Sequence, residues 1–202
     1  MQFYNAAAPS PRRVRIFLAE KGVELPRVDL DLPGGETYSE AFLRKNSLGQ
    51  VPVLETDDGS FITESQSICR YIEALHPEPN LFGKDPLERA RIDMWDRRME
   101  NEIFNALGLI ALHSFAHFKD KLTQVPAFAE AQRADMAGKF AWLDAELGDG
   151  RPYIGGERFT VADVTGMGAA MIADFLDVSI PDSCTHLQRW NENVRARPSW
   201  SA

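Results

Sequence analysis

The sequence predicts a small α/β domain followed by an all-helical domain. In the first third of the 202 residues, strand and helix patterns alternate in the order βαβαββα, which suits a small mixed sheet. Beyond residue 86 no segment has a convincing strand pattern, and helical periodicities take over. Two prolines within residues 76–80 indicate a linker. We therefore expect an α/β domain at 1–76, a linker at 77–86 and a helical bundle at 87–202.

The first half of the α/β domain is expected to hold a strand, a helix and a second strand. Residues 2–4 are a short strand candidate, and Pro9 and Pro11 open a helix that Gly22 ends. Residues 27–32 alternate between polar and apolar side chains, which is typical of a half-buried strand.

The second half of this domain is expected to add a short helix, a hairpin and a longer helix. The short helix covers 39–45, and a strand at 51–55 carries a proline near its start. An acidic turn at 57–60 leads into the next strand at 61–62. Residues 65–75 then place apolar side chains on one face, which predicts an amphipathic helix.

Four helices are expected in the second domain. The first covers 87–118 and is kinked near Gly108, and the second runs from Pro126 to about residue 147. The third opens at Thr160, and the fourth covers 182–197, where Pro198 ends it.

The composition disfavours several classes of protein. Asp and Glu number 30 against 22 Lys and Arg, and the net charge of -8 argues against a nucleic-acid-binding protein. No apolar run approaches the roughly 18–20 residues of a membrane span, and the N-terminus lacks the pattern of a secretory signal. Cys69 and Cys184 carry no pairing motif, so we expect reduced thiols in a cytoplasmic protein, with Cys69 in the core.

Most standard catalytic motifs are absent. The chain has no dinucleotide fingerprint, phosphate loop, HExxH pair or GxSxG elbow. His113 and His117 are four residues apart and could share a metal ion, but no further ligand accompanies them. We therefore expect no metal.

Two segments of the first domain have the pattern of a ligand site. A cis proline at Pro52 would leave the main chain of Val51 facing a cleft, whereas a trans proline would simply mark an edge strand. Glu64 and Ser65 stand where a helix begins, where Ser65 is either a plain N-cap or a carboxylate ligand and Glu64 can bind an ammonium group. The joint spacing predicts a site for a peptide-like ligand with α-amino and α-carboxyl groups.

The chain resembles the cytosolic glutathione S-transferases over essentially its whole length. The matching segments are VRIFLAEKG at 14–22, GQVPVL at 49–54, Glu64-Ser65 ahead of ICRYI, and FTVAD at 159–163. The resemblance implies a thioredoxin-like N-terminal domain, an all-helical C-terminal domain, a homodimer and reduced glutathione as co-substrate.

The resemblance also implies roles for individual residues. The main chain of Val51, ahead of a cis Pro52, would pair with the cysteinyl residue of glutathione. Glu64 and Ser65 would hold its γ-glutamyl end, and Gln50 would contact its glycyl end. Thr160 and Asp163 form a local helix cap, whose role is structural.

The thiol-activating position departs from the family pattern. The family commonly places a Tyr, Ser or Cys in the loop after the first strand, and the aligned residue here is Ala8. Ser10 is one candidate to activate the thiol in place of the usual residue, although its position also suits a helix cap or a turn. An atypical fungal and bacterial branch, similar at 12–22 and 92–98, uses a His and a Ser or Thr on the first long helix of the second domain. His113 and Ser114 are the matching pair, although adjacent helix residues point about 100° apart. Tyr4, inside the expected first strand, is a poorer candidate.

These features predict a glutathione S-transferase of the alkyl/aryl class that conjugates small hydrophobic electrophiles in detoxification. The apolar wall for the electrophile is expected on the first long helix, from Phe104, Leu107, Leu112 and Phe115, although any single one of them equally suits the core of the helical bundle. Two alternatives stay open: a glutathione-dependent disulfide or peroxide reductase, and a non-catalytic interaction protein, which Ala8 favours.

Overall fold

The computed structural model covers residues 1–202 and divides the chain into two units. One unit consists of Met1–Leu81 with Ser201–Ala202, and the other of Phe82–Trp200. No helix combines the length and the apolarity that a membrane crossing requires.

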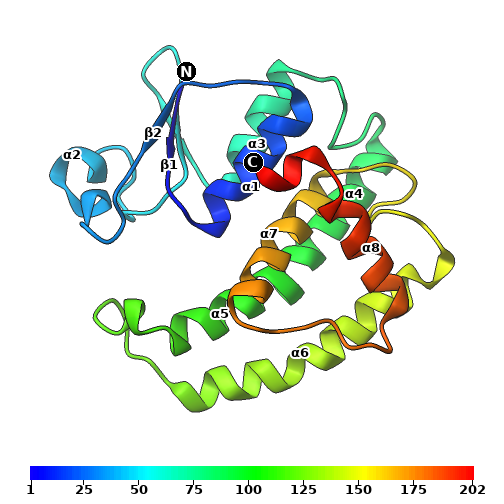
Figure 1. Cartoon of the computed structure of the whole chain (residues 1–202). Helices are drawn as coiled ribbons and strands as arrows, with labels where there is room; N and C mark the ends of the chain where they lie inside the picture. The colour runs from blue at the N-terminus through cyan, green and yellow to red at the C-terminus, as the bar shows by residue number, and fades with distance from the viewer. The chain divides into compact units, whose positions relative to one another are not determined.

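A four-stranded mixed sheet organises the N-terminal unit (Figure 1). Its strands, in chain order, are β1 (Gln2–Asn5), β2 (Arg27–Asp29), β3 (Val53–Glu55) and β4 (Phe61–Thr63). The spatial order is β2-β1-β3-β4, in which β1 runs parallel to β2 and antiparallel to β3, while β3 and β4 are antiparallel. This arrangement confirms the predicted α/β fold.

Helices cover both faces of the sheet. Helices α1 (Pro9–Lys21) and α3 (Ser65–Leu75) lie side by side on one face, and α2 (Glu40–Leu43) lies on the other (Figure 1). On the α2 face, Tyr4 and Val53 form a buried cluster with Phe42. Because side chains alternate along a strand, the neighbouring Phe3 and Leu54 are buried toward the opposite face.

Helix ends in this unit follow local sequence signals. Pro9 is the first residue of α1, and Gly22 ends the helix in the left-handed conformation with φ 63°. The expected helix 65–75 is confirmed as α3. A single 3-10 turn (Glu36–Tyr38) precedes α2, and the Ser39 hydroxyl caps α2 by accepting the Phe42 N–H at 3.2 Å.

Three expected elements of this unit are shorter than predicted. β2 ends at Asp29 instead of residue 32, because the Asp31 carboxylate accepts the Gly34 N–H at 3.0 Å and starts a turn. β3 begins at Val53 instead of residue 51, because Pro52 has no N–H to give to the ladder. The helix expected at 39–45 covers only the four residues of α2.

The C-terminal unit is all-helical, as predicted. Its α-helices are α4 (Pro86–Arg98), α5 (Asn105–Ser114), α6 (Pro126–Glu146), α7 (Val161–Phe175) and α8 (Thr185–Arg195). A π-helical segment (Met99–Phe104) joins α4 to α5, and 3-10 turns cover Ala116–Phe118 and Leu147–Asp149. A last 3-10 turn (Pro198–Ser201) begins in this unit and ends at Ser201, which is assigned to the other unit.

The expected kink near Gly108 is wrong. Gly108 lies inside α5, and the irregular stretch is the π-helical segment before it. The helix also ends at Ser114 instead of residue 118, because Phe115 is extended with φ -82° and ψ 129°. α8 starts at Thr185 instead of residue 182, because a turn closes with the Cys184 N–H on the Pro181 carbonyl at 2.9 Å.

The cap expected at Thr160 is a buried hydrogen-bond centre. Asp163 accepts the Thr160 N–H at 2.9 Å, the Ile154 N–H at 2.8 Å and the Trp190 indole N–H at 2.9 Å. Burial raises the pKa of the Asp163 carboxyl, while these donors act in the opposite direction. The contacts confirm a structural role for the Thr160–Asp163 pair, because they join the start of α7 to α8.

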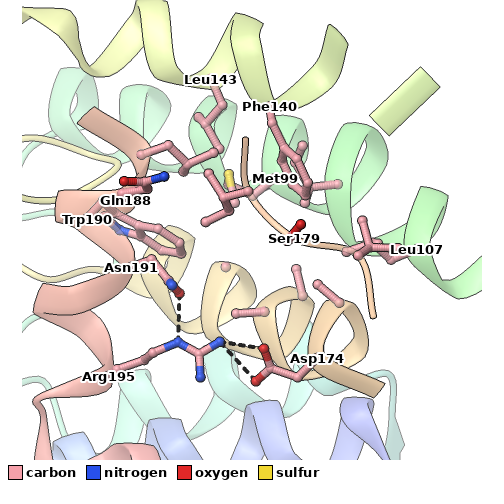
Figure 2. A pocket seen from close by; sticks show the side chains of 18 residues that line it. Met99, Leu107, Phe140, Leu143, Asp174, Ser179, Gln188, Trp190, Asn191 and Arg195 are labelled. Atoms are coloured by element: carbon pink, nitrogen blue, oxygen red, sulfur yellow. Dashed lines mark hydrogen bonds and ion pairs between the residues drawn. The ribbon is translucent and has the colours of Figure 1, made fainter. Parts of the chain in front are cut away.

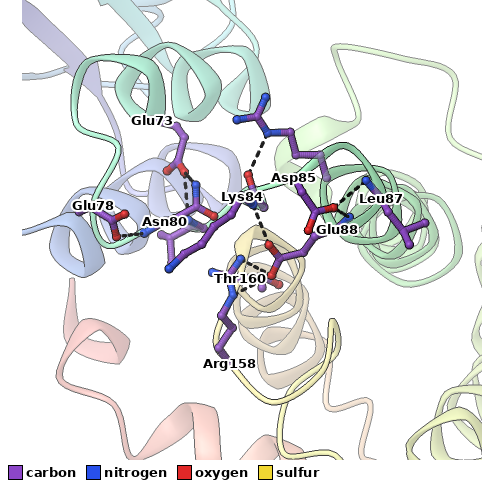
Figure 3. A network of polar contacts seen from close by, with 12 residues as sticks. Glu73, Glu78, Asn80, Lys84, Asp85, Leu87, Glu88, Arg158 and Thr160 are labelled. Atoms are coloured by element: carbon purple, nitrogen blue, oxygen red, sulfur yellow. Dashed lines mark hydrogen bonds and ion pairs between the residues drawn. The ribbon is translucent and has the colours of Figure 1, made fainter.

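The start of α4 is a second polar centre of this unit (Figure 3). Asp85 caps the helix by accepting the N–H groups of Leu87 and Glu88, both at 2.9 Å. Glu88 in turn accepts the Lys84 N–H at 2.7 Å and the Arg158 guanidinium at 2.6 Å. The start of α4 is thereby tied to the segment that precedes α7.

Candidate functional site

A small polar pocket lies in the N-terminal unit. Its volume is about 50 Å³, and it is lined by Ser10, Asn46, Gln50, Val51, Pro52, Glu64 and Ser65. The structure thus brings together six residues that the sequence predicts for the site, and it adds Asn46. A cavity of about 10–15 Å³ is enough to hold one water molecule, so this pocket is large enough for one charged end of a ligand.

Ser65 links the pocket to a buried positive charge. It is the first residue of α3, and its Oγ accepts a hydrogen bond from the Arg13 guanidinium of α1 at 3.1 Å. Arg13 is only 2% exposed. Because the hydroxyl accepts from Arg13, its own proton is available to donate into the pocket. The arrangement favours an anionic group beside Ser65.

Glu64 has an unusual backbone conformation. Its φ is 64° and its ψ 118°, and it immediately precedes α3. A non-glycine residue in such a conformation costs about 1–3 kcal/mol and tends to occur at functional sites. Its exposed carboxylate supplies a negative charge at the edge of the pocket.

The segment 46–52 presents free main-chain groups. The Val51–Pro52 peptide is cis, and neither the N–H nor the C=O of Val51 makes a hydrogen bond within the protein. Asn46 holds the loop, because its Nδ2 donates to the Gln50 carbonyl at 2.7 Å and its Oδ1 accepts the Leu48 N–H at 3.1 Å. Val51 can therefore pair with an extended ligand.

Ser10 offers two donors at the start of α1. Pro9 and Pro11 have no N–H, and the Arg12 N–H is used by the Ala8 carbonyl at 3.1 Å. The Ser10 N–H has no acceptor within the protein, and its half-buried side chain lines the pocket. A helix N-terminus with free donors stabilises an anion. Ala8, the N-cap of α1, contributes no side-chain hydrogen bond.

Tyr4 and the cysteines lie outside the pocket. Tyr4 is within β1, where its hydroxyl donates to Glu55 at 2.7 Å. This hydrogen bond holds the pKa of the Glu55 carboxyl below its usual range. Cys69 and Cys184 are both buried and form no disulfide, and the burial confirms the expected core position of Cys69.

His113 and Ser114 belong to the C-terminal unit, where they are the last two residues of α5. Nδ1 of His113 accepts the Val125 N–H at 3.1 Å, and the ring packs edge-on against Phe128 at 5.2 Å between centroids. His113 and His117 do not stand on one helix, because α5 ends at Ser114 and His117 lies in the following 3-10 turn. No group of three or more His, Cys, Asp or Glu residues is arranged as metal ligands.

The four residues expected to form an apolar wall have different surroundings within the C-terminal unit. Leu107 lines a cavity inside the C-terminal unit, whereas Phe104 is buried in the core. Leu112 and Phe115 are half-buried and do not line that cavity.

Sequence reasoning missed two residues of the site. Arg13 stands one helical turn before Phe17, on the apolar face of its helix. A charged residue on such a face is rarely buried without a partner, and this position could have indicated a buried polar contact. Asn46 opens the segment that leads to Pro52, and asparagine commonly organises turns through its side chain.

Both units match known families. Residues 8–75 match the family "Glutathione S-transferase, N-terminal domain", and residues 108–198 match "Glutathione S-transferase, C-terminal domain". Glutathione S-transferase 2 of Saccharomyces cerevisiae is 36% identical over 197 residues, which cover 96% of this chain and 84% of the yeast protein.

Solved structures show the same similarity. Gtt2 from Saccharomyces cerevisiae superposes with a TM-score of 0.92 at 35% identity and covers 100% of this chain and 99% of its own. A glutathione S-transferase domain-containing protein from Marinobacter aquaeolei has a TM-score of 0.93 at 36% identity, over 99% of this chain and 100% of its own.

Proposed function

Because the chain belongs to the glutathione S-transferase superfamily, we propose that it binds reduced glutathione in its N-terminal pocket and activates the thiol for transfer to a small hydrophobic electrophile. One observation carries the proposal: Glu64, Ser65 and the free main chain of Val51 converge on one pocket. These are the groups that a γ-linked tripeptide needs at its amino, carboxyl and amide positions.

The γ-glutamyl end of glutathione fits the Glu64–Ser65 corner. Its ammonium group pairs with the Glu64 carboxylate, and its carboxylate accepts the Ser65 hydroxyl proton. Arg13, behind Ser65 at 3.1 Å, adds a positive charge that favours the carboxylate. A pocket of about 50 Å³ suits this end of the ligand, with the remainder along the open main chain.

The cysteinyl and glycyl residues follow the segment 50–52. The cysteinyl amide pairs with the N–H and C=O of Val51, which the protein leaves unused. The exposed Gln50 side chain contacts the glycyl end. Asn46 acts as a positioning residue, because its hydrogen bond at 2.7 Å fixes the carbonyl just before Val51.

Ser10 is the proposed donor to the thiolate. A free thiol has a pKa near 8.5, and lowering this pKa by about two units requires about 2.7 kcal/mol. A charge-assisted hydrogen bond contributes about 1.5–3 kcal/mol, and a helix N-terminus adds about 0.3–1 kcal/mol. The hydroxyl and N–H of Ser10, at the start of α1, supply both kinds of interaction.

The transfer step is a nucleophilic attack. The thiol loses its proton to solvent, and the sulfur lone pair then forms a bond to an electrophilic carbon. Where the substrate carries a halide, the carbon–halogen bond breaks and the halide leaves with its electron pair. In this proposal no protein cysteine takes part, since both are buried.

Binding and activation are tested separately. Calorimetry with reduced glutathione should detect association with the full-length protein, and Glu64→Gln should weaken it at least about tenfold by removing the charge that faces the ammonium group. Glu24→Gln, at an exposed position of the same unit, is the matched control. No heat of association at millimolar glutathione would overturn the assignment.

The absorbance of the bound thiolate against pH tests activation. A titration midpoint below that of free glutathione supports the transferase. Glutathione that binds with an unshifted thiol indicates a non-catalytic interaction protein. Turnover of a disulfide or peroxide but not of an aryl halide indicates the reductase.

The proposal includes a cytoplasmic homodimer that acts in detoxification. Neither buried cysteine forms a disulfide, which suits a reducing compartment. Sedimentation of the full-length chain should give twice the monomer mass of 22.6 kDa. A single species of monomer mass at micromolar concentration would contradict the dimer.

A further inference from the structure

A second cavity is lined only by residues of the C-terminal unit (Figure 2). Its volume is about 270 Å³, and its apolar lining includes Met99, Leu107, Phe140, Leu143 and Trp190. These side chains come from the π-helical segment and from α5, α6 and α8. Its lining also includes the exposed residues Asp174 and Ser179, so the cavity opens to solvent.

Two features of the backbone shape the cavity. α7 presents small residues along it, namely Gly166, Ala169, Ala170 and Ala173. A Cβ on Gly166 would stand 2.6 Å from the Trp190 ring, so glycine lets the indole pack directly on α7. Met99 belongs to a π-helical segment, and such segments are frequent at functional sites.

The mouth of the cavity carries no net charge. Asp174 accepts two hydrogen bonds from the Arg195 guanidinium, at 2.7 and 2.9 Å, and Arg195 Nε donates to Asn191 Oδ1 at 3.0 Å (Figure 2). The cation and the anion neutralise each other, so the site offers little attraction to an ionic ligand.

Two amide side chains in the lining of the cavity each keep one polar group unused, one an acceptor and the other a donor. Gln188 donates its Nε2 to the Pro181 carbonyl at 3.0 Å, which leaves its Oε1 as an acceptor. Asn191 uses Oδ1 for Arg195, which leaves its Nδ2 as a donor. The two residues are three apart on α8 and therefore neighbours on its surface. A hydroxyl group both donates and accepts, so it complements either amide side chain.

We propose that this cavity binds a small neutral aromatic alcohol. A cavity of about 150 Å³ lined by apolar side chains accepts benzene, so 270 Å³ accommodates one or two rings. The ring would lie among Met99, Phe140 and Trp190, and the hydroxyl would face Gln188 and Asn191. The inference is independent of glutathione, because every lining residue belongs to the C-terminal unit.

The first test locates a probe directly. Crystals of the full-length protein soaked with 4-bromobenzyl alcohol should show the anomalous bromine signal among Met99, Phe140 and Trp190. Calorimetry in solution should detect the same compound and show a preference of about tenfold over 4-bromotoluene, which lacks the hydroxyl. Bromine density elsewhere only, or no heat in solution, would overturn the proposal.

Substitutions then test whether the compound binds in the cavity and not elsewhere on the protein. Ala170→Leu places a larger side chain in the cavity and should weaken binding of the alcohol at least about tenfold. Ala141→Leu, at an exposed position on α6, is the matched control and should bind normally. Gln188→Leu should abolish the preference for the alcohol over 4-bromotoluene while keeping both bound. Equal binding by Ala170→Leu, or an unchanged preference in Gln188→Leu, would contradict the site.

Discussion

The buried guanidinium of Arg13 on α1 donates a hydrogen bond to the hydroxyl of Ser65 on α3, at 3.1 Å. Ser65 is also the first residue of its helix, so the same hydroxyl stands at a helix N-terminus and beside a cation. Both effects favour a negative charge on the pocket side of Ser65. The proposed carboxylate subsite therefore depends on two helices that are far apart in the sequence.

Ser65→Ala should weaken glutathione binding about 10- to 100-fold, because it removes a hydrogen bond to a carboxylate. It should also lower the thermal midpoint, because the buried Arg13 loses an acceptor. Calorimetry and thermal unfolding measure the two effects. Ser67→Ala, at an exposed position of the same helix, is the matched control. Unchanged affinity in Ser65→Ala would remove Ser65 from the site.

Ser10→Ala should raise the pKa of the bound glutathione thiol by about one to two units, because the thiolate loses a charge-assisted hydrogen bond. The main-chain N–H of residue 10 stays in place, so part of the activation should survive. The thiolate absorbance of the complex measures the shift. If Ser10→Ala has no effect while His113→Ala or Ser114→Ala raises the pKa, the role belongs to that pair.

Gly49→Ala should destabilise the loop that presents Val51. Gly49 has φ 62°, and a Cβ there would lie 3.0 Å from the Tyr38 ring and 3.1 Å from the Thr37 carbonyl. Gly35→Ala is the matched control, since Gly35 has φ 77° but no atom within 4 Å of the added carbon. In each variant the free energy of unfolding should fall by about 1–2 kcal/mol, because alanine is strained in the left-handed conformation.

Only Gly49→Ala should lower the free energy of unfolding by more than about 1–2 kcal/mol. Only this variant should also bind glutathione more weakly. Denaturant unfolding and calorimetry make the comparison. Equal losses in the two variants would show that the contacts with Tyr38 and Thr37 relax freely.

Local signals predicted most of the fold. A proline at its start and a glycine after its end predicted α1, and the apolar periodicity of 65–75 predicted both end residues of α3 correctly. Some predictions failed at short turns, where a hydrogen bond between residues close in the sequence ended or delayed an element. The Asp31 carboxylate shortened β2, and the irregularity expected at Gly108 lies in the π-helical segment instead.

The candidate site was predictable where its groups follow each other in the chain. Val51 with Pro52 and Glu64 with Ser65 are adjacent pairs, and both line the pocket. Arg13 reaches the site through a contact 52 residues away in sequence, which no local pattern contains. The C-terminal cavity likewise arises from the packing of several helices, so the sequence pattern alone did not reveal it.

Acidification should weaken the tie between the start of α4 and the segment before α7. The Lys84 N–H and the Arg158 guanidinium hold the pKa of the Glu88 carboxyl below its usual range of about 4.3. Its stabilising contribution is therefore fully present above that range and is lost as the pH falls through the lower, folded-state pKa. Glu88→Gln should be less stable than the unmodified protein at pH 7, and the difference in free energy of unfolding should shrink below about pH 4. Glu157→Gln, at an exposed neighbour of Arg158, should show no such difference. A difference that persists unchanged to about pH 3 would show that the charge of Glu88 is not its source.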